Sequence, residues 1–124
     1  MSKGKRHYSL FFEDAIDAMN KIGSYIRDLD YESFSQNNMV IDAVVRNLEI
    51  IGEAIKNIPD NIIDKYPDIP WKRMIGLRNI VIHAYFGIDL ENIWKIITEN
   101  IPEVKPRIVE ILDDIRDEEN KDQR

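Results

Sequence analysis

The amino-acid sequence predicts an all-α protein, a helical bundle of four to five helices, on three observations. Apolar residues recur at spacings of three and four through most of the chain. No stretch alternates apolar and polar residues as a half-buried strand does, and no internal repeat or glycine-rich phosphate loop occurs. Three of the five prolines, Pro59, Pro67 and Pro70, fall between periodic runs, where helices have to end. We therefore expect one helical domain over residues 1–124, with a basic tail at about 1–7 and a charged tail at about 116–124.

The first periodic run predicts a helix over Tyr8–Leu29. Gly23 lies inside it and is expected to permit close packing against a neighbouring element. A polar connection follows, in which Ser33 or Ser35 is the expected cap of the next helix. Phe34, the large apolar residue of this connection, is expected to anchor it to the core.

A second helix is predicted to run to about Ile58, where Pro59 stops it. A connection with two further prolines follows, and Asp68 near its end is the expected cap of a central helix. The absence of proline over Trp71–Tyr85, together with its apolar filling, favours one continuous helix there.

After the central helix, Asp89 is the expected cap of the next one. Pro102 and Pro106 interrupt the following apolar face, so a kink or break is expected near Asn100. A last amphipathic helix follows, and the highly charged stretch Asp113–Arg124 is expected to fray.

Composition narrows the class of protein. The chain has 23 Asp and Glu against 17 Lys and Arg, a formal net charge of −6, which argues against a protein that coats nucleic acid nonspecifically. It has no cysteine, so no disulfide or thiolate chemistry is available. No signal-peptide run or bilayer-length apolar stretch occurs, so no membrane association and a cytoplasmic location are expected.

One segment departs from the acidic balance. No acid occurs between Asp68 and Asp89, and Lys72, Arg73 and Arg78 make this stretch locally cationic. Local charge, rather than net charge, decides whether an anionic ligand is attracted. The segment is therefore the first candidate for a functional surface.

On a helical wheel at about 100° per residue, Lys72, Asn79 and His83 share one polar stripe. Arg78 lies about 140° away from His83, so the two side chains do not simply meet on one helix. Either the helix is distorted near His83 or the site combines residues from two copies of the chain. We favour the second explanation, because a two-fold axis along the helix brings each face opposite its counterpart, and we expect a homodimer.

Two carboxylates of the second helix, Glu49 and Glu53, lie four residues apart. Charges at this spacing usually form a solvated face. The alternative is that one of them pairs with Arg78, whose place on an apolar face of its helix demands an acceptor.

The available chemistry is limited. Two histidines far apart, no cysteine and no carboxylate at ligand spacing near His83 make a metal site or other cofactor unexpected. Histidine can move protons near neutral pH, arginine can clamp a phosphate, and Asn79 can orient either group. His83 and Arg78 thus suffice for cleavage of RNA by its own 2′-hydroxyl, although such residues on a helix are more often structural than catalytic.

The motif of arginine, four residues, histidine, one residue and tyrosine is present as Arg78, His83 and Tyr85. With the polar Asn79 after the arginine, and a second-helix block over residues 42–54, the sequence resembles the HEPN superfamily, in particular its DUF86 or HepT-like branch. The resemblance covers the chain from about Tyr8 to Ile115.

The resemblance implies the toxin of a type VII toxin–antitoxin pair, a homodimeric, metal-independent endoribonuclease with Arg78 and His83 from both protomers at the dimer cleft. It implies an antitoxin of the MntA-like nucleotidyltransferase kind that transfers AMP to Tyr85. Phosphate added there would occupy a cationic cleft and repel RNA. With RNA as substrate, Lys72 and Arg73 are the expected RNA-binding residues.

Two other interpretations stay open. The chain is alternatively a noncatalytic helical partner that binds substrate or regulates a separately encoded nucleotidyltransferase, which the acidic total charge favours. A third possibility is a helical dimer without either role, in which Arg78 only satisfies Glu49 or Glu53 at the interface.

Overall fold

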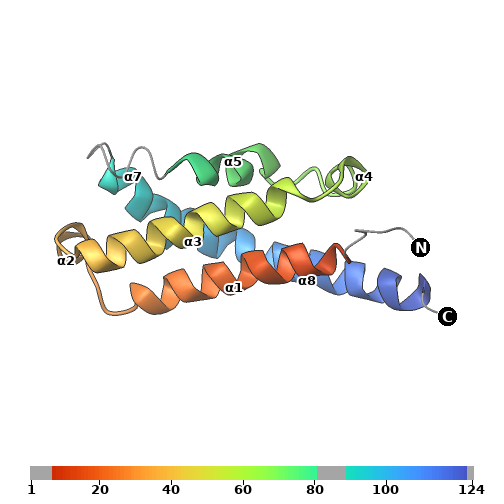
Figure 1. The fold of residues 1–124 in the computed structure, drawn as a ribbon, viewed down its shortest axis with the longest axis horizontal. Helices are drawn as coiled ribbons and strands as arrows, with labels where there is room; N and C mark the ends of the chain where they lie inside the picture. Colours follow the sequence, from red (N-terminus) through yellow and green to blue (C-terminus); the bar gives the residue numbers. More distant parts are fainter. Residues whose placement is uncertain (1–6, 81–88, 123–124) are drawn as a thin grey trace.

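The computed structural model describes residues 7–80 and 89–122, and this part of the chain is helical without strands. Three long helices, α1 (Ser9–Tyr25), α3 (Asn38–Lys56) and α8 (Ile101–Asp122), lie side by side and form the body of the bundle (Figure 1). The all-α prediction is confirmed. The start of α1 and the end of α8 lie at the same end of the molecule.

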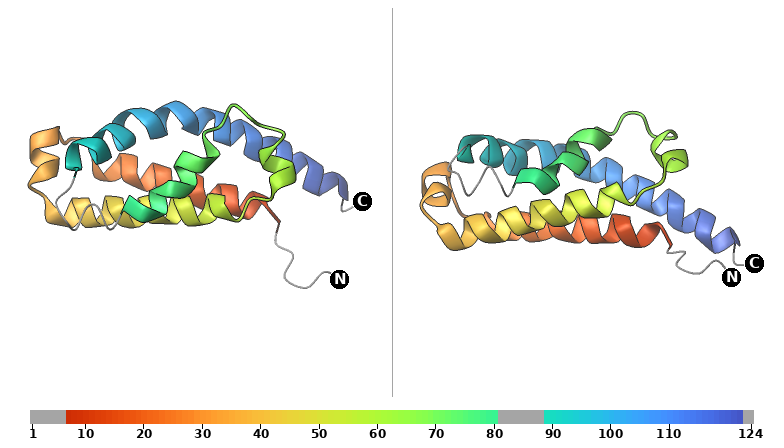
Figure 2. Two further views of the ribbon diagram at one scale, coloured as in Figure 1. Left: turned by 90° about the horizontal axis from the view of Figure 1, so that it is seen from above. Right: turned by 45° about the horizontal axis from the view of Figure 1, so that its top comes forward.

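Shorter elements connect and cover these helices. They are α2 (Tyr31–Ser35), α4 (Asp60–Ile63), α5 (Trp71–Gly76), the 3-10 helix η1 (Leu77–Asn79), α7 (Leu90–Lys95) and the π-helical turn η2 (Ile96–Asn100). Figure 2 shows α5 crossing over the bundle between α3 and α8. The cationic segment predicted from the sequence is therefore laid across the other helices.

The core forms where the apolar stripes of α1, α3 and α8 meet. Its fully buried side chains include Phe12, Leu48, Ile51, Ile55 and Ile111. Burying a side chain of this size is worth about 1.5–3 kcal/mol. The apolar residues at the predicted spacings of three and four therefore hold the three long helices together by packing against one another.

The turn between α1 and α3 is built by two caps. Asp30 accepts a hydrogen bond from the Ser33 backbone N–H (2.8 Å) at the start of α2, and Asn37 accepts one from the Val40 N–H (3.1 Å) at the start of α3. The expectation that Ser33 or Ser35 caps the second long helix is therefore wrong. Asn37 immediately precedes that helix, where its amide oxygen reaches a free N–H.

Phe34 anchors this turn as expected, since it is completely buried and its ring lies 5.1 Å from that of Trp94. The first helix ends at Tyr25, four residues before the predicted end. Gly23 is exposed, and a Cβ built on it meets nothing within 4 Å. The expected close packing at Gly23 is therefore wrong.

The break expected near Asn100 is present as the π-helical turn η2, in which the Ile101 N–H donates to the Ile96 carbonyl. Pro102 follows directly, and a proline ring clashes with the carbonyl four residues earlier in a regular helix. The wider turn relieves this conflict. Pro106 is accommodated inside α8.

The charged C-terminal stretch is not frayed over residues 113–122, because α8 extends to Asp122. Its charged side chains contact α1: Arg116 forms an ion pair with Glu13 at 2.9 Å, and Glu119 accepts a hydrogen bond from the Ser9 hydroxyl at 2.6 Å. Glu119 also accepts the Ser9 N–H at 3.2 Å, at the N-terminal end of α1. The prediction failed because a run of charges does not show which partners a neighbouring helix supplies.

Candidate functional site

The segment that carries Arg78 lies directly against α3, and Gly52 is the point of contact. A Cβ built on Gly52 would lie 2.7 Å from the Arg78 backbone nitrogen and 2.9 Å from the Ile75 carbonyl oxygen. Real Cβ atoms do not approach backbone this closely. Glycine in the middle of α3 therefore permits the close crossing of α3 by α5 and η1.

The crossing brings Arg78 to Glu53, the residue after Gly52. The Arg78 Nε lies 2.8 Å from Glu53 Oε1, and the two side chains are 36% and 50% exposed. Of the two interpretations of these acids, the alternative, pairing with Arg78, is the one observed for Glu53. The guanidinium is held at the surface, within reach of an external anion.

Glu49 does not share this role, since its carboxylate lies 4.0 Å from Arg46 of the same helix. Both acids line a shallow cleft of about 410 Å³ between α1 and α3, together with Phe11 and Ile50. The cleft adjoins the Arg78 guanidinium through Glu53.

The helix expected over Trp71–Tyr85 is not one regular α-helix. It is α-helical to Gly76 and continues as the 3-10 helix η1 to Asn79. A 3-10 helix advances about 120° per residue, so a wheel drawn at about 100° loses register after Leu77. The angle of about 140° between Arg78 and His83, which assumed a regular α-helix, therefore does not apply to this segment.

The other candidates within the described residues are at the surface. Lys72, Arg73 and Asn79 are exposed, and their side chains form no hydrogen bond or ion pair with the part of the chain described here. His83 and Tyr85 lie outside the described residues, so their positions and roles stay predictions.

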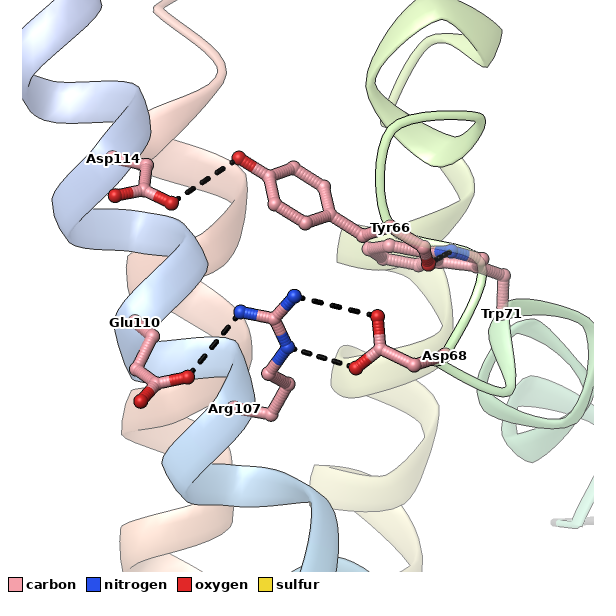
Figure 3. A network of polar contacts seen from close by, with 6 residues as sticks. All are labelled: Tyr66, Asp68, Trp71, Arg107, Glu110 and Asp114. Carbon is pink, nitrogen blue, oxygen red and sulfur yellow. Dashed lines mark hydrogen bonds and ion pairs between the residues drawn. The ribbon is translucent and has the colours of Figure 1, made fainter.

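A second contact region fixes the start of α5, and Figure 3 shows its side chains. Arg107 of α8 points toward Asp68: its Nε donates to Oδ2 at 2.8 Å and its Nη2 to Oδ1 at 3.4 Å. A third nitrogen, Nη1, donates to Glu110 at 3.3 Å. This two-point geometry ties the connection before α5 to α8.

Aromatic residues complete the same network. The guanidinium of Arg107 lies 5.3 Å from the centre of the Tyr66 ring, and the Tyr66 hydroxyl donates to Asp114 at 3.4 Å. The Tyr66 carbonyl in turn accepts the indole N–H of Trp71, the first residue of α5, at 2.9 Å. Sequence reasoning missed this network and assigned Asp68 to a helix cap instead, which is wrong.

Contacts within this network shift the pKa values of its ionisable side chains. The hydrogen bond from Arg107 lowers the pKa of Asp68 below 3.8, and the same bond raises the pKa of Arg107. Burial raises the pKa of Tyr66 above 10.0, with the nearby Asp114 carboxylate acting in the same direction. All three groups therefore keep their ordinary charge states at neutral pH.

Over residues 7–80 and 89–122, no three His, Asp or Glu side chains come together as a group able to hold a metal ion. Nor does any helix in those two ranges combine the length and the apolar character needed to cross a membrane.

The described fold and site define an all-helical protein in which a half-buried arginine on a cation-bearing segment is held beside a carboxylate. The chain belongs to the ribonuclease HepT-like family, whose model matches residues 15–111. The matched region includes Gly52, Glu53, Arg78 and Arg107.

Relatives agree with this assignment. A Methanocaldococcus jannaschii protein provisionally named an RNase is 44% identical over 104 residues, which cover 84% of this chain and 95% of that protein. A second such protein of the same organism is 41% identical over 113 residues, 91% of this chain and 97% of the relative. A Thermococcus cleftensis protein provisionally named ribonuclease HepT is 42% identical over 101 residues, 82% of this chain and 92% of the relative. No solved structure matches the chain significantly.

Proposed function

We propose that the chain is an endoribonuclease that acts as the toxin of a toxin–antitoxin pair in the cytoplasm. Membership of the ribonuclease HepT-like family and the RNase names of its relatives support the activity. The observation that carries the proposal is Arg78, held 2.8 Å from an exposed carboxylate on a segment that also presents Lys72 and Arg73.

Arg78 is suited to phosphate because its present partner is replaceable. Exposed ion pairs contribute only about 0–1 kcal/mol, so exchanging the Glu53 carboxylate for a phosphate group costs little. The guanidinium fork binds two phosphate oxygens at once and stabilises the negative charge that grows on them. Lys72 and Arg73 attract the neighbouring backbone of the RNA.

The proposed reaction needs no metal ion. The 2′-oxygen attacks the adjacent phosphorus while its proton passes to a base, and the bond from phosphorus to the 5′-oxygen breaks. The products are a 2′,3′-cyclic phosphate and a 5′-hydroxyl, the latter protonated as it leaves. His83 is the proposed proton carrier and Asn79 the residue that orients it.

We propose that the working form is a homodimer in which Arg78 and His83 of both copies meet at one cleft. Each protomer brings its arginine already held by its own Glu53, at the exposed edge of the bundle. The shallow α1–α3 cleft beside Glu53 provides adjoining surface for the second copy.

We further propose that an MntA-like nucleotidyltransferase is the antitoxin and transfers AMP from ATP to Tyr85. The added phosphate would compete with RNA for the cations of the segment. Mass spectrometry of the chain co-expressed with an MntA-like nucleotidyltransferase should show an AMP adduct that the Tyr85→Phe variant lacks. An unchanged adduct on Tyr85→Phe would rule out this site.

Growth and RNA cleavage after induced expression test the ribonuclease itself. Wild type should arrest growth and cleave RNA in the presence of EDTA, and His83→Ala should do neither at equal protein level. His7→Ala is the matched control, because His7 is exposed and its imidazole Nδ1 lies 3.6 Å from Glu119, near the C-terminal end of α8. Equal cleavage by His83→Ala and wild type would refute the proposal.

The second candidate is a noncatalytic partner of the nucleotidyltransferase, which the net charge of −6 favours over a free RNA-binding enzyme. Purified dimer that never cleaves RNA, yet binds the nucleotidyltransferase through the Arg78 surface, would support it.

A further inference from the structure

A groove of about 710 Å³ is lined by residues of α5 and η1 but by neither Arg78 nor Glu53. One wall is α5 with η1, and the other is formed by α7, η2 and the first turns of α8. Met19 of α1 and Ile51 of α3, both buried, form the floor. The volume falls in the range of about 300–1,000 Å³ typical of small-ligand sites.

The walls carry cations without local partners. Arg73 on α5 and Lys95 at the end of α7 line the groove, and neither forms an ion pair within the described ranges. Asp68 also lines it, but its charge is neutralised by Arg107. Glu103 is the remaining carboxylate of the lining, so the unpaired charges of the described walls favour an anion. The groove thus differs from the chain as a whole, whose formal net charge is −6.

The rim between the groove and Arg78 is low at Gly76. Gly76 is exposed, lines the groove, and a Cβ built on it meets nothing within 4 Å. Two residues further along, Arg78 pairs with Glu53, and neither of them lines the groove. A strand that crosses the segment at Gly76 therefore meets both Arg78 and the groove.

We propose that this groove is a nucleotide subsite, which receives the base and phosphate of the RNA residue next to the one cleaved at Arg78. The proposal rests on the proposed ribonuclease function. The partly exposed apolar side chains of the walls, Ile80, Ile96 and Val104, accept the face of an unstacked base, while Arg73 and Lys95 bind its phosphate. Single-stranded RNA is the substrate this requires, because only unstacked bases can turn into a pocket.

Binding of a fluorescent pentanucleotide with 2′-O-methyl groups tests the subsite, since this RNA cannot be cleaved by its own hydroxyl. Arg73→Gln and Lys95→Gln should each weaken binding roughly tenfold. Each should also lower the slope of log affinity against log salt by about 0.7, the value for one lost contact to a single strand. Gly76→Leu should weaken binding without unfolding the protein, because its side chain fills open space at the rim.

Matched controls come from the same chain. Gly23→Leu places the same side chain on another exposed helical glycine with open surroundings, and Arg27→Gln removes an exposed cation that does not line the groove. Both should bind the pentanucleotide as wild type does. Binding unchanged in Lys95→Gln and Gly76→Leu would overturn the subsite.

Cleavage of unmodified RNA, measured in parallel, separates this proposal from the function on which it rests. Groove-dependent binding without cleavage by wild type would leave the subsite standing and refute the ribonuclease. Cleavage by wild type that Lys95→Gln and Gly76→Leu leave unchanged would refute the subsite alone. If these variants instead change the mass of the assembly in solution and not RNA affinity, the groove holds a protein segment and the proposal is wrong.

Discussion

Gly52→Ala should separate the stability of the bundle from the placement of Arg78. The added Cβ would lie 2.7 Å from the Arg78 nitrogen, so the segment has to move by about 0.7 Å to reach an ordinary contact of 3.4 Å. Because both nearest atoms are backbone, no side-chain rotation relieves the contact. The whole crossing of α3 by α5 and η1 must shift.

Two opposing effects set the size of the stability change. Alanine is favoured over glycine inside a helix by about 1 kcal/mol. Overpacking of a close contact costs about 1–3 kcal/mol. The net loss is therefore about 0–2 kcal/mol, whereas Gly23→Ala, which has open space, should gain up to about 1 kcal/mol.

Urea unfolding of wild type, Gly52→Ala and Gly23→Ala measures this difference, and RNA cleavage measures its consequence. A displacement near 1 Å at a catalytic group can cost on the order of 100-fold in rate. Gly52→Ala should thus lose on the order of 100-fold in cleavage rate, while its free energy of unfolding falls by no more than about 2 kcal/mol. If it is as stable as Gly23→Ala and cleaves RNA at the wild-type rate, Gly52 does not position Arg78.

Three further changes test other contacts. Glu53→Gln keeps a hydrogen-bond acceptor for Arg78 but removes the negative charge that competes with phosphate, so KM for RNA should fall. The free energy of unfolding should change by less than about 1 kcal/mol. A higher KM would contradict this prediction. Asp68→Asn should lower Tm at pH 7. Because the pKa of Asp68 is depressed below 3.8, the Asp68–Arg107 pair stabilises the fold fully above about pH 5, and this stabilisation is lost as pH falls through the lowered pKa. The Tm values of wild type and Asp68→Asn should therefore converge in acid, and a difference that persists there would refute the assignment. Phe34→Ala should cost about 3–5 kcal/mol by urea unfolding, against less than about 0.5 kcal/mol for the 84% exposed Met39→Ala; equal losses would show that Phe34 does not anchor the turn.

Contacts that depend on periodicity or on neighbours in sequence were predictable. The apolar stripes gave the long helices, and Asp89 caps α7 as expected, accepting the Asn92 N–H at 3.0 Å. Phe34 was identifiable as an anchor because it is the large apolar residue of a polar stretch. The Arg78–Glu53 pair is an exception, since its residues are 25 positions apart; it was anticipated only as an alternative, because an arginine on an apolar face demands an acceptor.

Contacts between distant parts of the chain were not predictable from one sequence. Asp68 looked like a cap because it precedes a helix, but its partner Arg107 is 39 residues away. Gly52 gave only a weak signal, a glycine inside a strongly amphipathic helix next to Glu53. Gly23 gave the same signal and has open surroundings. Which glycine marks a crossing depends on where another helix passes, and that is a property of the fold.

The two contact regions together explain how a short segment can hold Arg78 in a fixed position. α5 has six residues and η1 three, too few to be stable as isolated helices. Arg107 and Tyr66 fix the beginning of the segment against α8, and Gly52 fixes its end against α3. Arg78 lies at the second of these regions, where the backbone is held tightly but the guanidinium remains 36% exposed. A fixed backbone with a replaceable partner suits the proposed binding of phosphate, because an arginine so held is oriented before a substrate arrives and has only a weak ion pair to give up.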